Sequence, residues 1–370
     1  MIQLRPSASS HWFHCAAMPR FSATLPEEAP SDPAREGTCA AWVAEMVLKG
    51  EANSTSDLVG TTHENGWLVE NEMAIYTQDY VDHLRSYGGE IHAERKVRLN
   101  EMVAGTPDAF AVAVASERGM YDLIIDDLKY GFDIVNPYRN TQVSIYGGAI
   151  LRMIGDRMKI RKVTIGIYQP RAWHPSGIHR TWEIWPEQLM EFVREIERAG
   201  HDAQAVDAQA TPGFHCNHCP AAHICVALTH SVYEGYRTIS DERYGELNAE
   251  QLAQELDFIN EMSTMVKARL TSLHAEATAR MKRAEHIPGY GFEEKFGNSK
   301  FNTDGLGVLA KTGIDPFEPR KVCTPAELIR RGADKDVVAS MTTRPRIPPK
   351  LIKYAPDHFK NLFAAKDNTQ

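Results

Sequence analysis

Two short apolar runs that end near acidic residues constrain the fold of this chain more than any other feature. Residues 109–114 (AFAVAV) and 121–125 (YDLII) have the composition of strands, and a Thr-Pro turn precedes the first run. Asp108 opens the first run, and Asp127 and Lys129 follow the second. Because side chains alternate between the two faces of a strand, Asp127 and Lys129 project from the same face. A hairpin of the two runs would bring Asp108 to that face.

Two carboxylates and one ammonium group around a single point suit phosphodiester hydrolysis. Carboxylate oxygens at Asp108 and Asp127 are suitable ligands for Mg²⁺, and Lys129 could stabilise developing charge. Gln142 and Tyr146 are four residues apart, so they share one face of a helix and could line the same cleft. The alternative interpretation is a β-hairpin whose Asp and Lys side chains are simply solvated at a strand end.

The order of three short motifs resembles a known nuclease group. Residues 105–108 (GTPD), 127–131 (DLKYG) and 142–146 (QVSIY, a Gln-x-x-x-Tyr pair) follow one another as in the RecB-like branch of the PD-(D/E)XK nuclease superfamily. The DLKYG string is most similar to the phage and prophage proteins of that branch. The resemblance covers residues 5–230 in the main, and it implies a nuclease fold for this part of the chain.

The same resemblance implies a role for each motif residue. Asp108 and Asp127 would be the ligands of a catalytic Mg²⁺ or Mn²⁺ ion. Lys129 would be the catalytic lysine, and Gln142 and Tyr146 would belong to the accessory motif.

One departure from the family pattern lies in a helix expected at residues 35–49. The expected helix resembles the Gly-x-x-x-His helix of RecB-like nucleases, in which the histidine is a frequent metal ligand. Here Gly37 is followed four residues later by Ala41. The departure leaves open whether one or two catalytic metals bind.

A cysteine group lies beyond the predicted nuclease core. Cys216, Cys219 and Cys225 have the spacing C-x2-C-x5-C, which places three thiols within ten residues and favours metal binding over separate core positions. Three thiolates need a fourth ligand. A zinc ion could take a histidine, whereas an iron–sulfur cluster would prefer another cysteine. The histidines within reach are His215, His218 and His223.

Cys15 is the candidate fourth thiolate, although it lies about 200 residues upstream. One cysteine before the core and three after it resemble the iron–sulfur staple of AddB-type and CRISPR-adaptation nucleases. That resemblance implies a structural [4Fe-4S] cluster, with Zn²⁺ as the alternative. Cys39 and Cys323 are expected to be small hydrophobic residues without a metal role.

Hydrophobic periodicity predicts an α/β fold, a mixed central sheet flanked by helices, in a domain spanning residues 1–232. A C-terminal extension, residues 233–370, would hold a long amphipathic helix, a short hairpin and a basic tail. The predicted helices are 70–86, 139–154, 186–199 and 248–286; the predicted strands are 91–99, 162–169 and 182–185; the hairpin is 290–301; and the basic tail is 320–353.

Composition limits the class of protein. With 49 acidic and 41 basic residues the net charge is −8, which argues against a protein that coats DNA along its whole surface but leaves room for a local basic groove. The first residues lack the basic start and apolar run of a signal peptide, and no window resembles a membrane span. We therefore expect a cytoplasmic protein, in the host cytoplasm if phage-encoded, without a membrane partner.

These patterns together predict a DNA nuclease of phage recombination or replication. Exonuclease activity is expected by analogy with the family, and the expected partners are DNA and a single-strand annealing protein or another recombination factor. A non-catalytic DNA-binding or assembly protein that keeps the nuclease fold is the alternative, which Ala41 favours and the intact Asp108, Asp127 and Lys129 oppose. A zinc-stabilised protein with an unrelated pocket is a third hypothesis.

Overall fold

A five-stranded mixed β-sheet forms the centre of the part of the chain that the structure describes. This computed structural model describes residues 2–25, 30–240 and 246–291, which fall within one structural unit, residues 1–291. The strands lie in the order β1-β4-β5-β6-β7, and a separate ribbon pairs β2 with β3. The strands are β1 (Glu90–Ala93), β2 (Val97–Arg98), β3 (Ala104–Gly105), β4 (Ala109–Val114), β5 (Met120–Leu128), β6 (Lys159–Tyr168) and β7 (His179–Ile184).

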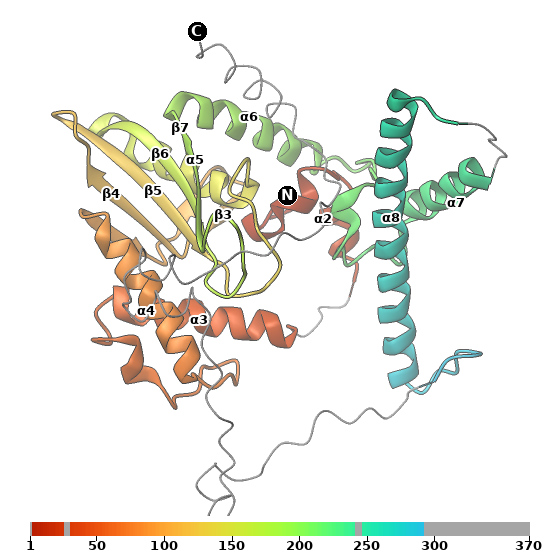
Figure 1. Cartoon of the computed structure of the whole chain (residues 1–370), viewed down its shortest axis with the longest axis horizontal. Coiled ribbons are helices and arrows are strands. Elements are labelled where there is room, and N and C mark those ends of the chain that lie inside the picture. The colour runs from red at the N-terminus through yellow and green to blue at the C-terminus, as the bar shows by residue number, and fades with distance from the viewer. Residues whose placement is uncertain (1, 26–29, 241–245, 292–370) are drawn as a thin grey trace, which may run out of the picture. The chain divides into compact units, whose positions relative to one another are not determined.

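Helices cover both faces of this sheet (Figure 1). On one face α5 and α6 enclose the larger core with the inward side chains of β4, β5 and β6. On the other face α3 and α4 form a second core against Ala109, Leu128 and Tyr168. The predicted α/β fold, a mixed central sheet flanked by helices, is therefore confirmed. The helices are α1 (Ser9–Trp12), α2 (Met18–Ser22), α3 (Asp32–Leu48), α4 (Asn71–Ser86), α5 (Thr141–Ile154), α6 (Pro186–Asp202), α7 (Val226–Ser240) and α8 (Ala249–Lys282).

The two apolar runs of the sequence pair as an antiparallel hairpin of β4 and β5. Ala109 lies opposite Asp126, and Val114 lies opposite Tyr121. β5 then runs parallel to β6, with α5 as the crossover, because a tight turn cannot join two parallel strands. β1 and β7 run antiparallel to their neighbours and form the edges of the sheet.

Alternation along β5 sends successive side chains into different cores. Leu123 and Ile125 are buried on the face covered by α5 and α6, whereas Ile124 is buried on the opposite face. The same alternation places Asp127 on the α5 side of the strand and Asp126 on the α4 side. Both aspartates are buried, at 2% and 0% exposed, so each must find polar partners on its own face.

Five helices lie where the sequence predicted them, within a few residues at each end: α3, α4, α5, α6 and α8. Their starts follow ordinary capping chemistry. Asn140 accepts a hydrogen bond from the Val143 amide at the start of α5. Asn248 and Gln251 bond reciprocally at the start of α8 and form a capping box.

The single strand predicted at residues 91–99 is wrong in its extent. β1 ends at Ala93 and pairs with β4, whereas β2 leaves the main sheet and pairs with β3. Glu94, between them, has a φ of 49°, a left-handed conformation that no continuous strand contains. The chain therefore turns at Glu94, beside the start of β4.

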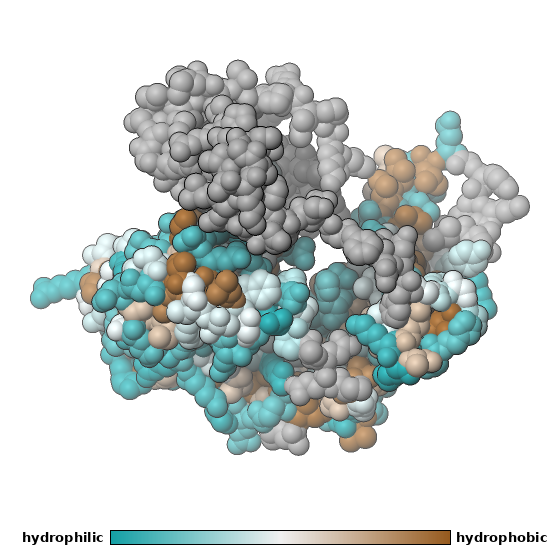
Figure 2. Space-filling model, turned by 90° about the horizontal axis from the view of Figure 1, so that it is seen from below, coloured by the Kyte–Doolittle hydropathy of each residue, from teal (hydrophilic) through white to brown (hydrophobic). Residues whose placement is uncertain are grey.

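The cysteine segment packs against α8. Met262 and Met265 of α8 share a small core with Cys216 and Leu228, and Arg269 donates a hydrogen bond to the Ala222 carbonyl at 2.9 Å. The other apolar side chains of α8 are only partly covered by the rest of the protein. In the view of Figure 2, hydrophobic patches interrupt a largely hydrophilic surface. The half-exposed apolar side chains of α8, between 39% and 51% exposed, are Leu252, Leu256, Ile259, Val266, Leu270 and Leu273.

Three expectations concern residues beyond those described. The basic tail (320–353), Cys323 and nearly all of the predicted hairpin (290–301) lie outside the described ranges.

Cys39 is buried in the second core at 0% exposure, in agreement with its predicted role as a small hydrophobic residue. Within the described ranges, every helix is too short or too polar to cross a membrane.

Candidate functional site

The two motif aspartates lie side by side at one end of the β4–β5 hairpin. Since Ala109 pairs with Asp126, the next position in this antiparallel register sets Asp108 opposite Asp127. Asp108 is held in place by its Oδ2, which accepts a hydrogen bond of 2.7 Å from the Leu128 amide. The register of the hairpin thus positions Asp127 at the end of β5 and Asp108 at the residue just before β4.

Lys129 and Gln142 close a polar cluster around Asp127. Lys129 Nζ lies 2.7 Å from Asp127 Oδ2 and donates to Gln142 Oε1 at 3.2 Å. Gln142 Nε2 in turn donates to Asp127 Oδ1 at 3.1 Å. Tyr146, one turn further along α5, lies close enough to Gln142, Asp127 and Asp108 for these groups to influence the pKa of its hydroxyl. All five residues that the sequence singled out for this site, including Asp108, therefore lie together.

The close approach of Tyr146 depends on the first residue of the GTPD motif. A Cβ at Gly105 would lie 2.8 Å from Pro6 Cγ and 3.0 Å from Tyr146 Cε1. Glycine therefore lets the β3 backbone pass directly beside the tyrosine ring. Within the GTPD motif, Gly105 therefore allows close packing, whereas Asp108 supplies a carboxylate.

The site combines two neighbouring carboxyl groups with one cation. Burial raises the pKa of Asp108 to about 8, and the neighbouring Asp127 charge adds to this shift, while Lys129 opposes it. Burial lowers the pKa of Lys129, but the charges of Asp127 and Asp108 outweigh it and raise that pKa above its usual value. Lys129 is therefore a firmly protonated cation, and Asp108 without a metal ion retains a proton near neutral pH.

The donor set at this end of the hairpin fits a hard divalent cation. Asp127 Oδ2 is buried, and apart from its ion pair with Lys129 it accepts no hydrogen bond from the described residues. Mg²⁺ and Mn²⁺ are commonly bound by two neighbouring carboxylates with free lone pairs. The charge of a divalent ion would also stabilise the ionised form of Asp108. Asp108 and Asp127 are the residues that would hold such an ion.

Glu94 is a nearby acid that the sequence reasoning missed. Its amide donates to the Asp108 carbonyl at 3.1 Å, and its charge contributes to the raised pKa of Asp108. Burial, with a smaller contribution from Glu45, raises the pKa of Glu94 itself to about 7. No local pattern marked Glu94, because it reaches the site only through the left-handed turn that separates β1 from β2.

Helix α3 brings another carboxylate toward the same region. Ala41 is a half-buried position of α3, and Glu45 lies one turn further along that helix. Glu45 is close enough to Glu94 to raise its pKa, and it also pairs with Lys49. Acidic side chains therefore extend from α3 through Glu94 toward Asp108.

The four predicted cysteines also converge. Cys15, Cys216, Cys219 and Cys225 line one small, largely enclosed pocket between the N-terminal segment and the residues after α6. Burial raises the pKa of Cys219 to about 11, and the other three thiols add to the shift. Backbone amides point at two of the sulfurs, at 3.4 Å each, from Gly213 to Cys216 and from Leu228 to Cys225.

The spacing of these thiols bears on the choice between zinc and an iron–sulfur cluster. Four sulfurs around one zinc, at bonds of about 2.3 Å, would lie roughly 3.8 Å apart. In the described residues, the cysteines do not form a group of donor atoms within 4.8 Å of one another. His215 lines the same pocket, but its Nε2 contacts the Thr211 carbonyl, while His223 bonds to Pro220. The pocket thus brings the four thiols together without identifying the metal.

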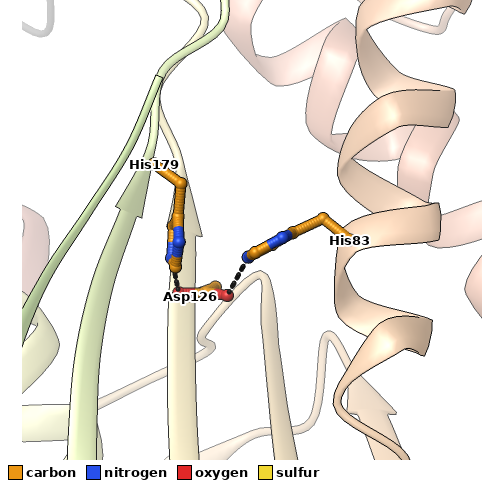
Figure 3. Close-up of side chains that lie close together, drawn as sticks. All are labelled: His83, Asp126 and His179. Carbon is orange, nitrogen blue, oxygen red and sulfur yellow. Dashed lines mark hydrogen bonds and ion pairs between the residues drawn. The ribbon is translucent and has the colours of Figure 1, made fainter. Parts of the chain in front are cut away.

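Asp126, the neighbour of Asp127, occupies a different polar site. On the α4 side of the sheet it meets His83 from α4 and His179 from β7 (Figure 3). These three residues are the one described group of at least three His, Cys, Asp or Glu side chains whose donor atoms all lie within 4.8 Å. Sequence reasoning missed the two histidines, which are distant from Asp126 along the chain.

Comparison with protein-family models identifies one match, which is described as "Protein of unknown function (DUF2800)" and covers residues 2–346. A search of curated proteins finds no match to the chain. The family match includes the hairpin carboxylates, the cysteine pocket and α8. It spans most of the 370 residues, and the chain therefore belongs to the DUF2800 family.

Proposed function

We propose that this protein is a Mg²⁺-dependent nuclease that hydrolyses phosphodiester bonds of DNA, with a PD-(D/E)XK core of the RecB-like type. The observation that carries the proposal is the single cluster of Asp108, Asp127, Lys129, Gln142 and Tyr146 on one face of the sheet. A solvated hairpin end would leave these side chains free in water. Here they are partly or fully buried instead. Asp127, Lys129 and Gln142 bond to one another, and Asp108 accepts a hydrogen bond from the Leu128 amide.

The chemistry follows from the charges in the cluster. A Mg²⁺ ion bound by Asp108 and Asp127 would supply Lewis acidity and activate water for attack on phosphorus. Lys129 would donate to the oxygen that gains charge in the transition state, and its raised pKa keeps the proton on the ammonium group. Gln142 bridges Lys129 and Asp127, so it fixes the ammonium group relative to the carboxylate before substrate arrives.

The cysteine pocket would be a structural clamp in this proposal. A [4Fe-4S] cluster bound by Cys15, Cys216, Cys219 and Cys225 would join the start of the nuclease core to the segment that follows it. N–H···S hydrogen bonds of the kind seen at Cys216 and Cys225 stabilise thiolates in iron–sulfur sites. Zinc remains the alternative, and metal analysis of protein purified without oxygen separates the two.

The proposed substrate is linear DNA, and exonuclease action in recombination or replication is the working hypothesis for its biological use. The test is digestion of linear single- and double-stranded DNA with Mg²⁺ or with excess EDTA. We expect digestion with Mg²⁺ only, and a loss of at least about 100-fold in Asp108→Asn, which removes one ligand charge at nearly constant shape. Asp156→Asn, an exposed site after α5, is the matched control and should digest DNA as the wild type does. Equal rates for Asp108→Asn and the wild type would refute the proposal.

Ala41 favours one other function, a DNA-binding protein that keeps the nuclease fold without turnover. In that case the protein would retain linear DNA on a filter in the presence of Mg²⁺ and leave its length unchanged. The length of the DNA on a gel after incubation with Mg²⁺ therefore separates the two functions.

A further inference from the structure

Asp126 is the centre of a four-residue polar cluster on the α4 side of the sheet. Its Oδ1 lies 3.0 Å from His179 Nε2, and its Oδ2 lies 3.4 Å from His83 Nε2. The Tyr87 hydroxyl donates to the same Oδ2 at 3.1 Å. Tyr87 also lies 2.9 Å from His83 Nε2 and 3.5 Å from His179 Nε2. Five polar atoms, namely the two imidazole Nε2 atoms, both Asp126 carboxylate oxygens and the Tyr87 hydroxyl oxygen, therefore lie close together.

Three of these side chains are spaced closely enough to share a first-row metal ion. One donor atom from each of His83, Asp126 and His179 lies within 4.8 Å of the other two. A zinc ion with bonds of about 2.0–2.1 Å at tetrahedral angles holds its N and O ligands roughly 3.3 Å apart, and the two Asp126–imidazole distances of 3.0 and 3.4 Å are close to that value. The ring centroids of His83 and His179 are 4.1 Å apart, so both imidazoles can present Nε2 to one ion without rotating away.

The surrounding fold keeps space for the carboxylate. A Cβ at Gly166, on β6, would lie 1.6 Å from Asp126 Oδ1 and 2.8 Å from His179 Nε2, so a side chain there would displace both groups. Tyr80, from α4, donates its hydroxyl to the Asp126 carbonyl at 2.8 Å and fixes the strand beneath the cluster. Asp126 is completely buried, whereas the His83 and His179 side chains are 24% and 19% exposed, which gives an ion a path from solvent.

We propose that His83, Asp126 and His179 form a second metal site that takes Zn²⁺ or a related first-row divalent cation, with the Tyr87 hydroxyl beside it as a hydrogen-bond donor to the carboxylate. Two imidazole nitrogens select for zinc-like ions and against Mg²⁺, which prefers an all-oxygen set. The site would tie α4 to β5 and β7 from behind the strand that carries Asp127. Its existence does not depend on the proposed nuclease activity, because its ligands face the opposite side of the sheet.

Metal uptake by the full chain tests the site. The protein, treated with EDTA and then equilibrated with a small excess of Zn²⁺, would be passed through a desalting column and analysed for zinc and iron. We expect His83→Gln and His179→Gln to bind one equivalent of zinc less than the wild type, or to bind it at least about 10-fold more weakly. His274→Gln, an exposed histidine of α8, is the matched control and should keep the wild-type content.

A spectroscopic reading on the wild type guards against variants that fail to fold. Co²⁺ added to the EDTA-treated wild type should produce visible d–d bands from a nitrogen- and oxygen-ligated ion, without the near-ultraviolet charge-transfer band of thiolates. Zn²⁺ should then bleach those bands. Cobalt bands that appear only with the thiolate signature, or zinc contents that are equal in the wild type and both histidine variants, would overturn the site and leave a hydrogen-bonded Asp126 network.

Discussion

Lys129→Ala separates the role of the ammonium group in folding from its role in turnover. At 2.7 Å, and with an effective dielectric constant of about 20, the Lys129–Asp127 attraction is about 6 kcal/mol before desolvation is subtracted. Removing the lysine leaves Asp108 and Asp127 facing each other without a cation. Loss of one partner of a buried pair costs about 3–5 kcal/mol, and the 30% exposure of the Lys129 side chain favours the lower end.

The variant should therefore lose about 3 kcal/mol of unfolding free energy without metal, and Mg²⁺ should restore part of it by neutralising the two carboxylates. Turnover should fall about 100- to 1,000-fold at saturating Mg²⁺, while KM for DNA changes little, because the lysine acts mainly on charge that develops during reaction. Urea denaturation with and without Mg²⁺, and initial rates on linear duplex DNA, measure the two effects. A variant with wild-type kcat would refute the assigned role of Lys129.

Three further predictions concern other parts of the fold. The pKa of Asp108, about 8, lies above its usual value, so the folded protein retains a proton that the unfolded chain loses. The free energy of unfolding of the metal-free protein should therefore fall as pH rises from about 5 to 8. Denaturation at several pH values should show a flatter slope for Asp108→Asn. Gly166→Ala should lower the free energy of unfolding by about 3 kcal/mol or more in urea denaturation, because the new Cβ displaces the Asp126 carboxylate. The control Gly37→Ala, at a helix position with open space, should raise it by up to about 1 kcal/mol. Equal urea midpoints for the two variants would contradict the close approach of Gly166 to Asp126. Cys219→Ser should lose the iron of anaerobically purified protein while Cys39→Ser keeps it, and iron retained by both would exclude the clamp.

The hairpin site was predictable because its information is local. The alternation of one strand places Asp127 and Lys129 on one face, and the i, i+4 spacing on α5 places Gln142 and Tyr146 together. Asp108 needed only the assumption that the two apolar runs pair. Each of these steps depends on a period of the chain that the sequence displays directly.

The second polar site was not predictable in the same way. His179 and Asp126 are 53 residues apart, and their contact depends on the parallel crossover that brings β6 next to β5 and on the antiparallel pairing of β7 with β6. His83 reaches Asp126 only because α4 packs across that face of the sheet. The alternation did place Asp126 away from Asp127, but the partners of Asp126 follow from packing, which no spacing in the sequence records.

The most direct test of the proposed active site compares the same substitution at two adjacent positions of β5. Asp127→Asn and Asp126→Asn each remove one buried carboxylate charge, on opposite faces of the strand. The measurement is the initial rate of Mg²⁺-dependent nucleotide release from linear duplex DNA, at a temperature where denaturation curves show both variants folded. We predict a loss of at least about 100-fold for Asp127→Asn and a rate within about tenfold of wild type for Asp126→Asn. Wild-type digestion by Asp127→Asn would contradict the account.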